Sequence, residues 1–240
     1  LLLLLGSLLP KLVSAQHHEQ TYFPPTDSLV LNKLATWQDY KFGLLMHWGA
    51  YSQWGVVESW SICPEDEDWC TRRGPYSGSY YDYVSHYENL QKTFNPTQFD
   101  PTLWAKAAKN AGMKYMVFTT KHHDGFCMFD TEFSNYSVAD PSCPNSKSAH
   151  PDLVKPIFDA FSDQGLWVGA YFSKPDWHHP DYWDPKFPPY DRNPNYDLLK
   201  KPAKWESFVS FTHNQIMELM QNYGKVDILW LDGGWVQPYT

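Results

Sequence analysis

Positive charge is scarce in this sequence, and several familiar functional motifs are absent from it. The 240 residues include 19 Lys and Arg against 27 Asp and Glu, a net charge of -8, which disfavours nucleic acid and anionic membranes as partners. No Gly-x-Ser-x-Gly motif supports a serine nucleophile. No His-x-His pair is present either, so we expect neither a metal-dependent barrel hydrolase nor a cofactor.

Long apolar runs are also missing, apart from one at the start of the chain. Residues 1–15 combine a leucine-rich segment with the small residues Ser14 and Ala15, as expected for the remnant of a signal peptide cleaved after Ala15. The run is too short to span a bilayer. We therefore expect a secreted, periplasmic or lysosomal protein whose folded part is residues 16–240, truncated at both ends.

Cysteine is rare, with four residues in the chain. Cys63 and Cys70 flank an acidic loop, and this spacing is compatible with a small disulfide or with two free thiols. Cys127 and Cys143 have no assigned partner. The triplet that begins at Asn135 is an N-glycosylation sequon, although such triplets also arise by chance.

Four short apolar runs alternate with helical patterns. The runs cover residues 42–48, 115–120, 167–172 and 226–231, and their continuous hydrophobicity is typical of strands covered on both faces. Apolar stripes at helical spacing lie between the later runs, at 100–112, 153–165 and 202–224. This order predicts an α/β fold, the N-terminal half of a (β/α)8 TIM barrel with about four strands. A four-stranded doubly wound sheet is the competing fold, but the first turn has no glycine-rich phosphate cradle.

The loops after the strands are long and aromatic. Residues 49–99 and 174–201 exceed the usual connection of about two to six residues, which indicates functional insertions. Aromatic residues make up 18% of the chain. Their flat faces suit sugar rings, and a thick aromatic core is an equally reasonable interpretation. Residues 175–183 could likewise form a sugar platform or a proline-stiffened surface loop.

Polar residues gather where the predicted strands end. The four ends carry His47, the run His122-His123-Asp124, the pair Tyr171 and Ser173, and Asp232. In a barrel these positions ring one pocket, so their coincidence predicts a site. A buried carboxylate at Asp232 would need hydrogen bonds or cations, and the three histidines are candidates. The alternative is structural, with Asp232 capping the turn at Gly233 and Gly234.

Five segments in series resemble the retaining α-L-fucosidases of glycoside hydrolase family 29. They are KFGLLMHWG (41–49), FNPTQFD (94–100), KHHDGFCMFD (121–130), YFSKPDWH (171–178) and LWLDGGW (229–235). The resemblance runs from about residue 30 to the last residue. It implies an N-terminal barrel catalytic domain that is followed, in intact members, by a β-sandwich.

The resemblance also implies residue roles. Asp232 corresponds to the nucleophile, and the other matching positions would contact the substrate: His47, Trp48, Glu58, His122, His123, Tyr171 and Trp230. The general acid/base is expected beyond residue 240, so the chain alone would be inactive. The expected partners are fucosylated glycans, with no membrane span and no bound metal. The alternative function is a non-catalytic fucose-binding protein on the same scaffold, which would keep the histidines but need no second acid.

Overall fold

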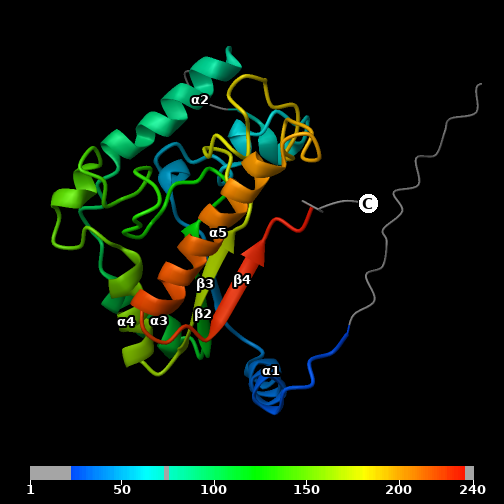
Figure 1. Cartoon of the computed structure of the whole chain (residues 1–240). Helices are drawn as coiled ribbons and strands as arrows, with labels where there is room; N and C mark the ends of the chain where they lie inside the picture. Colours follow the sequence, from blue (N-terminus) through cyan, green and yellow to red (C-terminus); the bar gives the residue numbers. More distant parts are fainter. Residues whose placement is uncertain (1–22, 73–75, 236–240) are drawn as a thin grey trace, which may run out of the picture. The chain divides into compact units, whose positions relative to one another are not determined.

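Four parallel strands form one sheet in the computed structural model. They are β1 (Leu44–Met46), β2 (Tyr115–Lys121), β3 (Trp167–Ser173) and β4 (Ile228–Asp232), and they lie in the order β1-β2-β3-β4. Figure 1 shows the arrows of β3 and β4 pointing the same way, with the loop 174–201 at their arrowhead end. A sequential order is that of a barrel, whereas a doubly wound sheet reverses its order at a switch point. The predicted half barrel is confirmed.

The structure describes residues 23–72 and 76–235. The predicted signal peptide, residues 1–15, lies outside the described residues. The described residues up to Asp39 belong to one unit, and the described residues from Tyr40 onward belong to the other. Helix α1 (Ser28–Tyr40) begins after Asp27, whose carboxylate accepts hydrogen bonds from the backbone of Leu29 and Val30. None of the described helices is long and apolar enough to cross a membrane.

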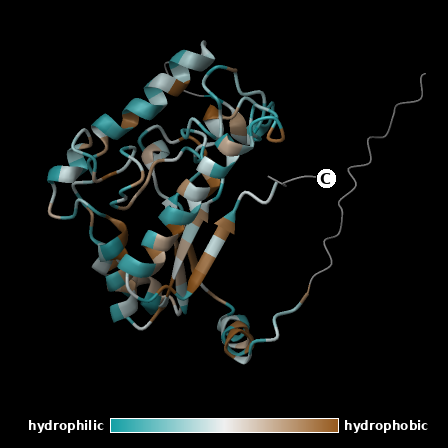
Figure 2. Cartoon of the chain, in the orientation of Figure 1, coloured by the Kyte–Doolittle hydropathy of each residue, from teal (hydrophilic) through white to brown (hydrophobic). Residues whose placement is uncertain are grey.

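The inner strands β2 and β3 are more buried than the edge strand β4. In β2 and β3 every residue after the first is buried, as the continuous apolar pattern predicts. In β4, by contrast, Leu229, Trp230 and Leu231 are 38%, 43% and 45% exposed. Figure 2 shows β4 largely in brown, so the edge of the described sheet is an apolar strand. An apolar edge of this kind is expected in a partial barrel.

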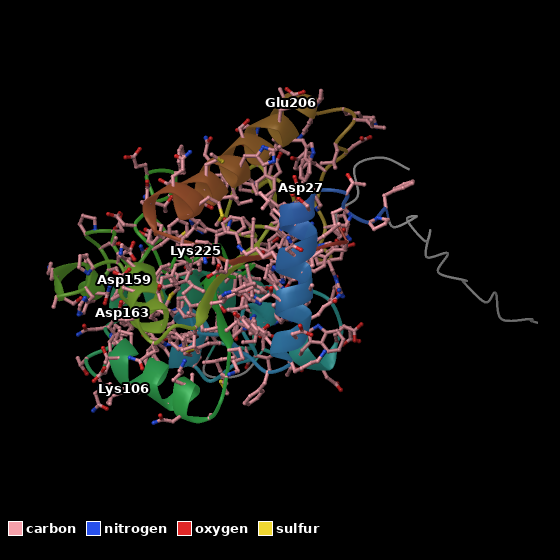
Figure 3. All side chains as sticks on the ribbon, turned by 90° about the horizontal axis from the view of Figure 1, so that it is seen from below. Asp27, Lys106, Asp159, Asp163, Glu206 and Lys225 are labelled. Carbon is pink, nitrogen blue, oxygen red and sulfur yellow. The ribbon has the colours of Figure 1, made fainter. Side chains whose placement is uncertain are left out.

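Three helices connect the strands where the apolar stripes predict them. They are α3 (Pro101–Asn110), α4 (Val154–Asp163) and α5 (Pro202–Asn222). Asp100 caps α3 by accepting a 3.0 Å hydrogen bond from the backbone of Leu103, with Pro101 in the first turn. The buried face of α4 consists of Val154, Ile157, Phe158 and Phe161. Figure 3 shows the charged Asp159 and Asp163 on the opposite, exposed face.

The region 49–99 contains helical structure that the sequence patterns did not predict. Helix α2 (Tyr80–Glu88) begins at Ser79, whose hydroxyl accepts from the backbone of Asp82. Its tyrosine and valine residues are weak helix formers, which hides the signal. Short 3-10 helices account for more of the insertion and for one turn before α4: Ala50–Gln53, Trp60–Ile62, Asp68–Cys70, Asn89–Thr93 and Pro144–Lys147.

A buried ion pair joins the end of β2 to the loop after β3. Lys121 is 0% exposed, and its Nζ lies 3.0 Å from Oδ2 of Asp176 and 3.0 Å from Oε1 of Gln215 on α5. The same ammonium lies 4.4 Å from the ring centre of Phe172. Burial alone would raise the pKa of Asp176, but the nearby charge of Lys121 outweighs it and lowers that pKa. Asp176 is therefore ionised, and Nζ of Lys121 has two oxygen partners.

Gly125 is the position where this arrangement excludes a side chain. Its φ is +79°, in the region that favours glycine, and a Cβ there would lie 2.3 Å from Oδ1 of Asp176. The tight turn after β2 thus depends on the absence of a side chain.

Replacing Lys121 with Met should destabilise the protein by about 3–5 kcal/mol, because it leaves a buried carboxylate without its cation. The matched control is Lys155→Ala, since Lys155 pairs with Asp159 on the exposed surface of α4 and such pairs contribute at most about 1 kcal/mol. Chemical unfolding of both variants measures the difference. Equal stability losses would contradict the structural role given to Lys121.

Candidate active site

The ends of the four strands bring five predicted residues into one group. His47 follows β1, His122 and His123 follow β2, Tyr171 lies near the end of β3, and Asp232 ends β4. The ring centres of His47 and Tyr171 are 4.6 Å apart, and those of His122 and His123 are 4.2 Å apart. Parallel strands end at the same edge of the sheet, which explains why residues so distant in sequence meet here.

Asp232 has two differently engaged oxygens. Oδ1 accepts a 2.7 Å hydrogen bond from the backbone of Gly233, so the structural alternative of a turn cap is correct for this oxygen. Oδ2 accepts a 2.5 Å hydrogen bond from the hydroxyl of Tyr171 and lies 3.7 Å from Nε2 of His123. Burial and the contact with Asp232 raise the pKa of Tyr171, which keeps the phenol protonated as a donor. The side chain of Asp232 is 38% exposed and therefore accessible to a ligand.

Glu58 lies between two of the histidines. Its Oε2 is 3.1 Å from Nε2 of His122, and its Oε1 is 3.6 Å from Nε2 of His47. Burial alone would raise the pKa of Glu58, but the hydrogen bond from His122 and the charges of both histidines outweigh it and lower that pKa. Glu58 has a φ of +47°, a conformation that costs a non-glycine residue about 1–3 kcal/mol. Such local strain is typical of functional positions.

His123 is the most enclosed member of the group, with a side chain that is 0% exposed. Burial, followed by the neighbouring His122 and Lys121, lowers the pKa of His123 well below its ordinary value. Nδ1 lies 2.5 Å from the hydroxyl oxygen of Ser173. The backbone oxygen of His123 accepts a 2.7 Å hydrogen bond from the backbone of Trp177. The last residue of β3 therefore holds the ring of His123, and the loop after β3 holds its backbone.

Aromatic rings from three loops pack around His123. Trp60, Trp177 and Trp235 have ring centres 5.2, 5.0 and 5.0 Å from its imidazole. Trp177 is 5% exposed, so this part of the stretch 175–183 is an interior wall rather than the sugar platform or the surface loop considered from the sequence.

An ion pair between Arg192 and Glu65 joins the two long loops beside these rings. Nε of Arg192 lies 2.7 Å from Oε1 of Glu65, and the guanidinium also lies over the ring of Trp60 at 5.2 Å. The contact links residues 127 positions apart in the chain. A charge-assisted hydrogen bond thus connects the loop 49–99 to the loop 174–201.

Two of the predicted substrate-binding residues are placed differently from the rest. Trp48 lies in a separate aromatic cluster, with its ring centre 5.6 Å from those of Phe94 and Trp104. The structure therefore does not bring Trp48 to the histidines. Trp230 pairs in register with Tyr171 and is 43% exposed, so its predicted contact with substrate stays a prediction.

Metal-ligand atoms also come close together in this group. The donor atoms of His47, Glu58 and His122 lie within 4.8 Å of one another, and the same is true of His122, His123 and Asp232. Either set could hold a metal ion by composition. Hydrogen bonds already account for both nitrogens of His122, through Ser59 and Glu58. The expectation of a metal-free site stays a prediction.

The residues of the predicted covalent modifications all lie within the described part of the chain. Cys63 and Cys70 are free buried thiols that share a hydrogen bond, and burial raises the pKa of Cys63. Their disulfide stays a prediction. Asn135 is exposed while Ser137 of the same sequon is 2% exposed, so a glycan on Asn135 would point outward and its occupancy also stays a prediction.

Comparison with known proteins identifies the family. A family model described as alpha-L-fucosidase matches residues 10–240. The chain belongs to the α-L-fucosidase family. Among its relatives, the tissue alpha-L-fucosidase of Rattus norvegicus is 32% identical over 99% of this chain and 47% of its own length. The tissue alpha-L-fucosidase of Bos taurus is 31% identical over 100% of this chain and 48% of its own length.

Solved α-L-fucosidase structures share the fold. Isoenzyme 1 from Paenibacillus thiaminolyticus has a TM-score of 0.66 and 34% identity, over 86% of this chain and 44% of that one. A trapped covalent intermediate of a Bacteroides thetaiotaomicron GH29 fucosidase has a TM-score of 0.65 and 29% identity, over 90% of this chain and 44% of that one. The chain spans about half the length of the curated relatives it matches.

Several contacts in this site were not predicted from the sequence. Ser59 and Trp60 lie in a 3-10 region of the insertion, where no periodic pattern marks them. Lys121 and Asp176 belong to the family motifs, but their pairing does not follow from those motifs. Ser173 ends a predicted strand, but nothing in the sequence indicates its contact with His123. Spacing in a sequence does not show which loop reaches which side chain, so these contacts needed the structure.

The pKa of His123 predicts how stability changes with pH. His123 has a lower pKa in the folded protein than in the unfolded chain, where the pKa of a histidine is about 6.5. The contribution of His123 to the free energy of unfolding is therefore complete above about pH 6.5. It is lost as the pH falls towards the folded-state pKa, because only the unfolded chain then binds the proton. Each such histidine contributes a slope of at most about 1.4 kcal/mol per pH unit. Melting temperatures between pH 7.5 and 5 should fall, and less steeply in His123→Gln.

His178 provides the opposite control for this pH dependence. Burial alone would lower the pKa of His178, but its contact with Glu88, at 2.8 Å, outweighs burial and raises that pKa. Its contribution is complete below the unfolded pKa and is lost as the pH rises through the folded-state value. The variant His178→Gln should therefore steepen the fall in melting temperature above about pH 6.5 and leave it unchanged below that pH. Parallel pH profiles for both variants would contradict the two assignments.

Proposed function

We propose that this chain is the N-terminal catalytic part of a retaining exo-α-L-fucosidase, with Asp232 as the nucleophile. The observation that carries this proposal is the position of Asp232 at the end of β4, with Oδ2 held by Tyr171 and faced by His123. A carboxylate so placed is ordered, accessible and surrounded by groups that bind sugar hydroxyls. The related Bacteroides thetaiotaomicron fucosidase has been trapped as a covalent intermediate with 2-fluoro-fucosyl fluoride, which supports a covalent route in the family.

The reaction would proceed by two displacements. An oxygen of Asp232 attacks the anomeric carbon of α-L-fucose and forms a glycosyl ester, while the bond to the leaving oxygen breaks and a second carboxylic acid protonates that oxygen. The same second group, now a base, takes a proton from water as the water attacks the anomeric carbon and releases Asp232. The two carboxyl groups need a separation of about 5–5.5 Å.

Recognition of the sugar would fall to the polar ring around Asp232. His47, Glu58, His122 and His123 supply hydrogen-bonding groups for hydroxyls, and Tyr171 orients the nucleophile. Fucose carries a methyl group in place of a hydroxymethyl group, and an aromatic wall suits it. One methyl contact is worth about 1–3 kcal/mol, so contacts with hydroxyls must provide most of the selectivity. The substrates of such an enzyme are fucosylated glycans, and residues 1–15 support a secretory route.

Replacing Asp232 with Ala in the full-length protein should lower hydrolysis of an aryl α-L-fucoside by several orders of magnitude, because the covalent step is lost. Added azide should restore turnover and give β-L-fucosyl azide, since the small anion attacks in place of the carboxylate. The product is identified by NMR. Wild-type activity in this variant would reject Asp232 as the nucleophile. Fucose binding without any hydrolysis by the wild-type protein would favour the alternative of a carbohydrate-binding protein.

The 240-residue chain by itself should show no fucosidase activity. The acid/base is expected beyond residue 240, and Glu58, which lies beside the histidines, has a lowered pKa that makes it a poor proton donor to the leaving group. Purified chain is assayed with the same aryl fucoside, beside the full-length protein as a positive control. Measurable turnover would show that the acid/base lies within these residues.

A further inference from the structure

The hydrogen bonds of Ser173 decide which nitrogen of His123 carries the proton. The Ser173 hydroxyl oxygen lies 2.5 Å from the backbone oxygen of Pro175 and 2.5 Å from Nδ1 of His123. A carbonyl oxygen can only accept, so the single hydroxyl proton of Ser173 is donated to Pro175. The oxygen of Ser173 then faces Nδ1 with a lone pair. Nδ1 of His123 must therefore be the donor.

The other nitrogen of His123 faces the nucleophile. Nε2 is buried, has no hydrogen-bond partner among the described residues, and lies 3.7 Å from Oδ2 of Asp232. Burial keeps the pKa of His123 low, so the ring is neutral and Nε2 bears a lone pair. Two acceptors thus face each other. Within the described part of the chain, Asp232 Oδ2 receives one hydrogen bond, from Tyr171, and none from His123.

The adjacent histidine has the opposite arrangement. Nε2 of His122 lies 3.1 Å from the Glu58 carboxylate, which can only accept, so this nitrogen is the donor. Nδ1 of His122 faces the hydroxyl of Ser59, which can donate to it. Both serines are fully buried and each contacts an Nδ1 atom. His122 has a carboxylate to fix its tautomer, however, whereas His123 depends on Ser173.

We propose that Ser173 is a positioning residue that locks His123 in the Nδ1–H tautomer and so prevents it from donating a hydrogen bond to the nucleophile. This role rests on the proposed function of Asp232. In the other tautomer, Nε2–H would point at Oδ2 of Asp232 across the 3.7 Å gap. A hydrogen bond there would stabilise the carboxylate before attack and would be lost as its charge disappears in the ester. By fixing the Nδ1–H tautomer, Ser173 leaves Asp232 without this hydrogen bond and so keeps its carboxylate nucleophilic.

A neutron crystal structure of the full-length protein in heavy water tests the tautomer without reference to catalysis. Deuterium is expected on Nδ1 of His123 and not on Nε2, and on Nε2 of His122. In Ser173→Ala, deuterium should appear on Nε2 of His123. The matched control Ser59→Ala should leave both tautomers unchanged, because Glu58 still holds His122. Deuterium on Nε2 of His123 in the wild-type protein would overturn the proposal, whatever the fate of the proposed function.

Kinetics test whether the tautomer acts through Asp232. Ser173→Ala should lower kcat for an aryl fucoside by about 10- to 100-fold with little change in KM, the factor expected for one added hydrogen bond to a carboxylate. Ser173→Thr, which keeps the hydroxyl, should recover most of the rate. In the azide-rescued Asp232→Ala background, adding Ser173→Ala should change the rate less than about 2-fold. Equal losses with and without Asp232 would show a merely structural role and overturn the proposal.

Discussion

The buried pair of Lys121 and Asp176 is the contact on which the site depends. It fixes the loop after β3 against the end of β2, and Oδ1 of the same carboxylate accepts from the backbone of His178 and His179. The loop held in this way carries Trp177, which binds the backbone of His123. Replacing both residues of such a pair with apolar side chains often changes stability little, whereas removing one of them is costly. The value of the pair here is positional, because it sets where the loop lies over the histidines.

The pocket divides its polar groups into two sets. Glu58 contacts and orients His47 and His122 on one side. On the other side, Asp232 is supported by Tyr171 and by the backbone of Gly233, and it faces an acceptor instead of a cation. A carboxylate that attacks carbon must be held without being over-stabilised. His47 and His122 therefore contact Glu58, and Asp232, the proposed nucleophile, accepts from two neutral donors.

The sequence predicted the parts of this protein that follow from periodicity. The sheet, α3, α4, α5 and the meeting of residues at strand ends come from local patterns and from the rule that parallel strands end at one edge. Helix α2 was not predicted, because its many tyrosines are weak helix formers. The contacts of Ser59, Ser173 and Lys121 join segments that are 50 to 63 residues apart, and no local pattern encodes such pairings. Trp48 shows that closeness in the sequence can also mislead. It follows the site residue His47 directly, but its ring lies in a separate aromatic cluster with Phe94 and Trp104.

The absence of a side chain at Gly125 allows Lys121 and Asp176 to pair. The turn there leaves no room for even a methyl group beside the Asp176 carboxylate, and that carboxylate neutralises Lys121. An alanine at this turn would displace the acid, and the stranded ammonium would then favour loss of its own charge or of the local fold. Positions 121, 125 and 176 are therefore physically coupled, because any side chain at 125 would displace the carboxylate that pairs with Lys121.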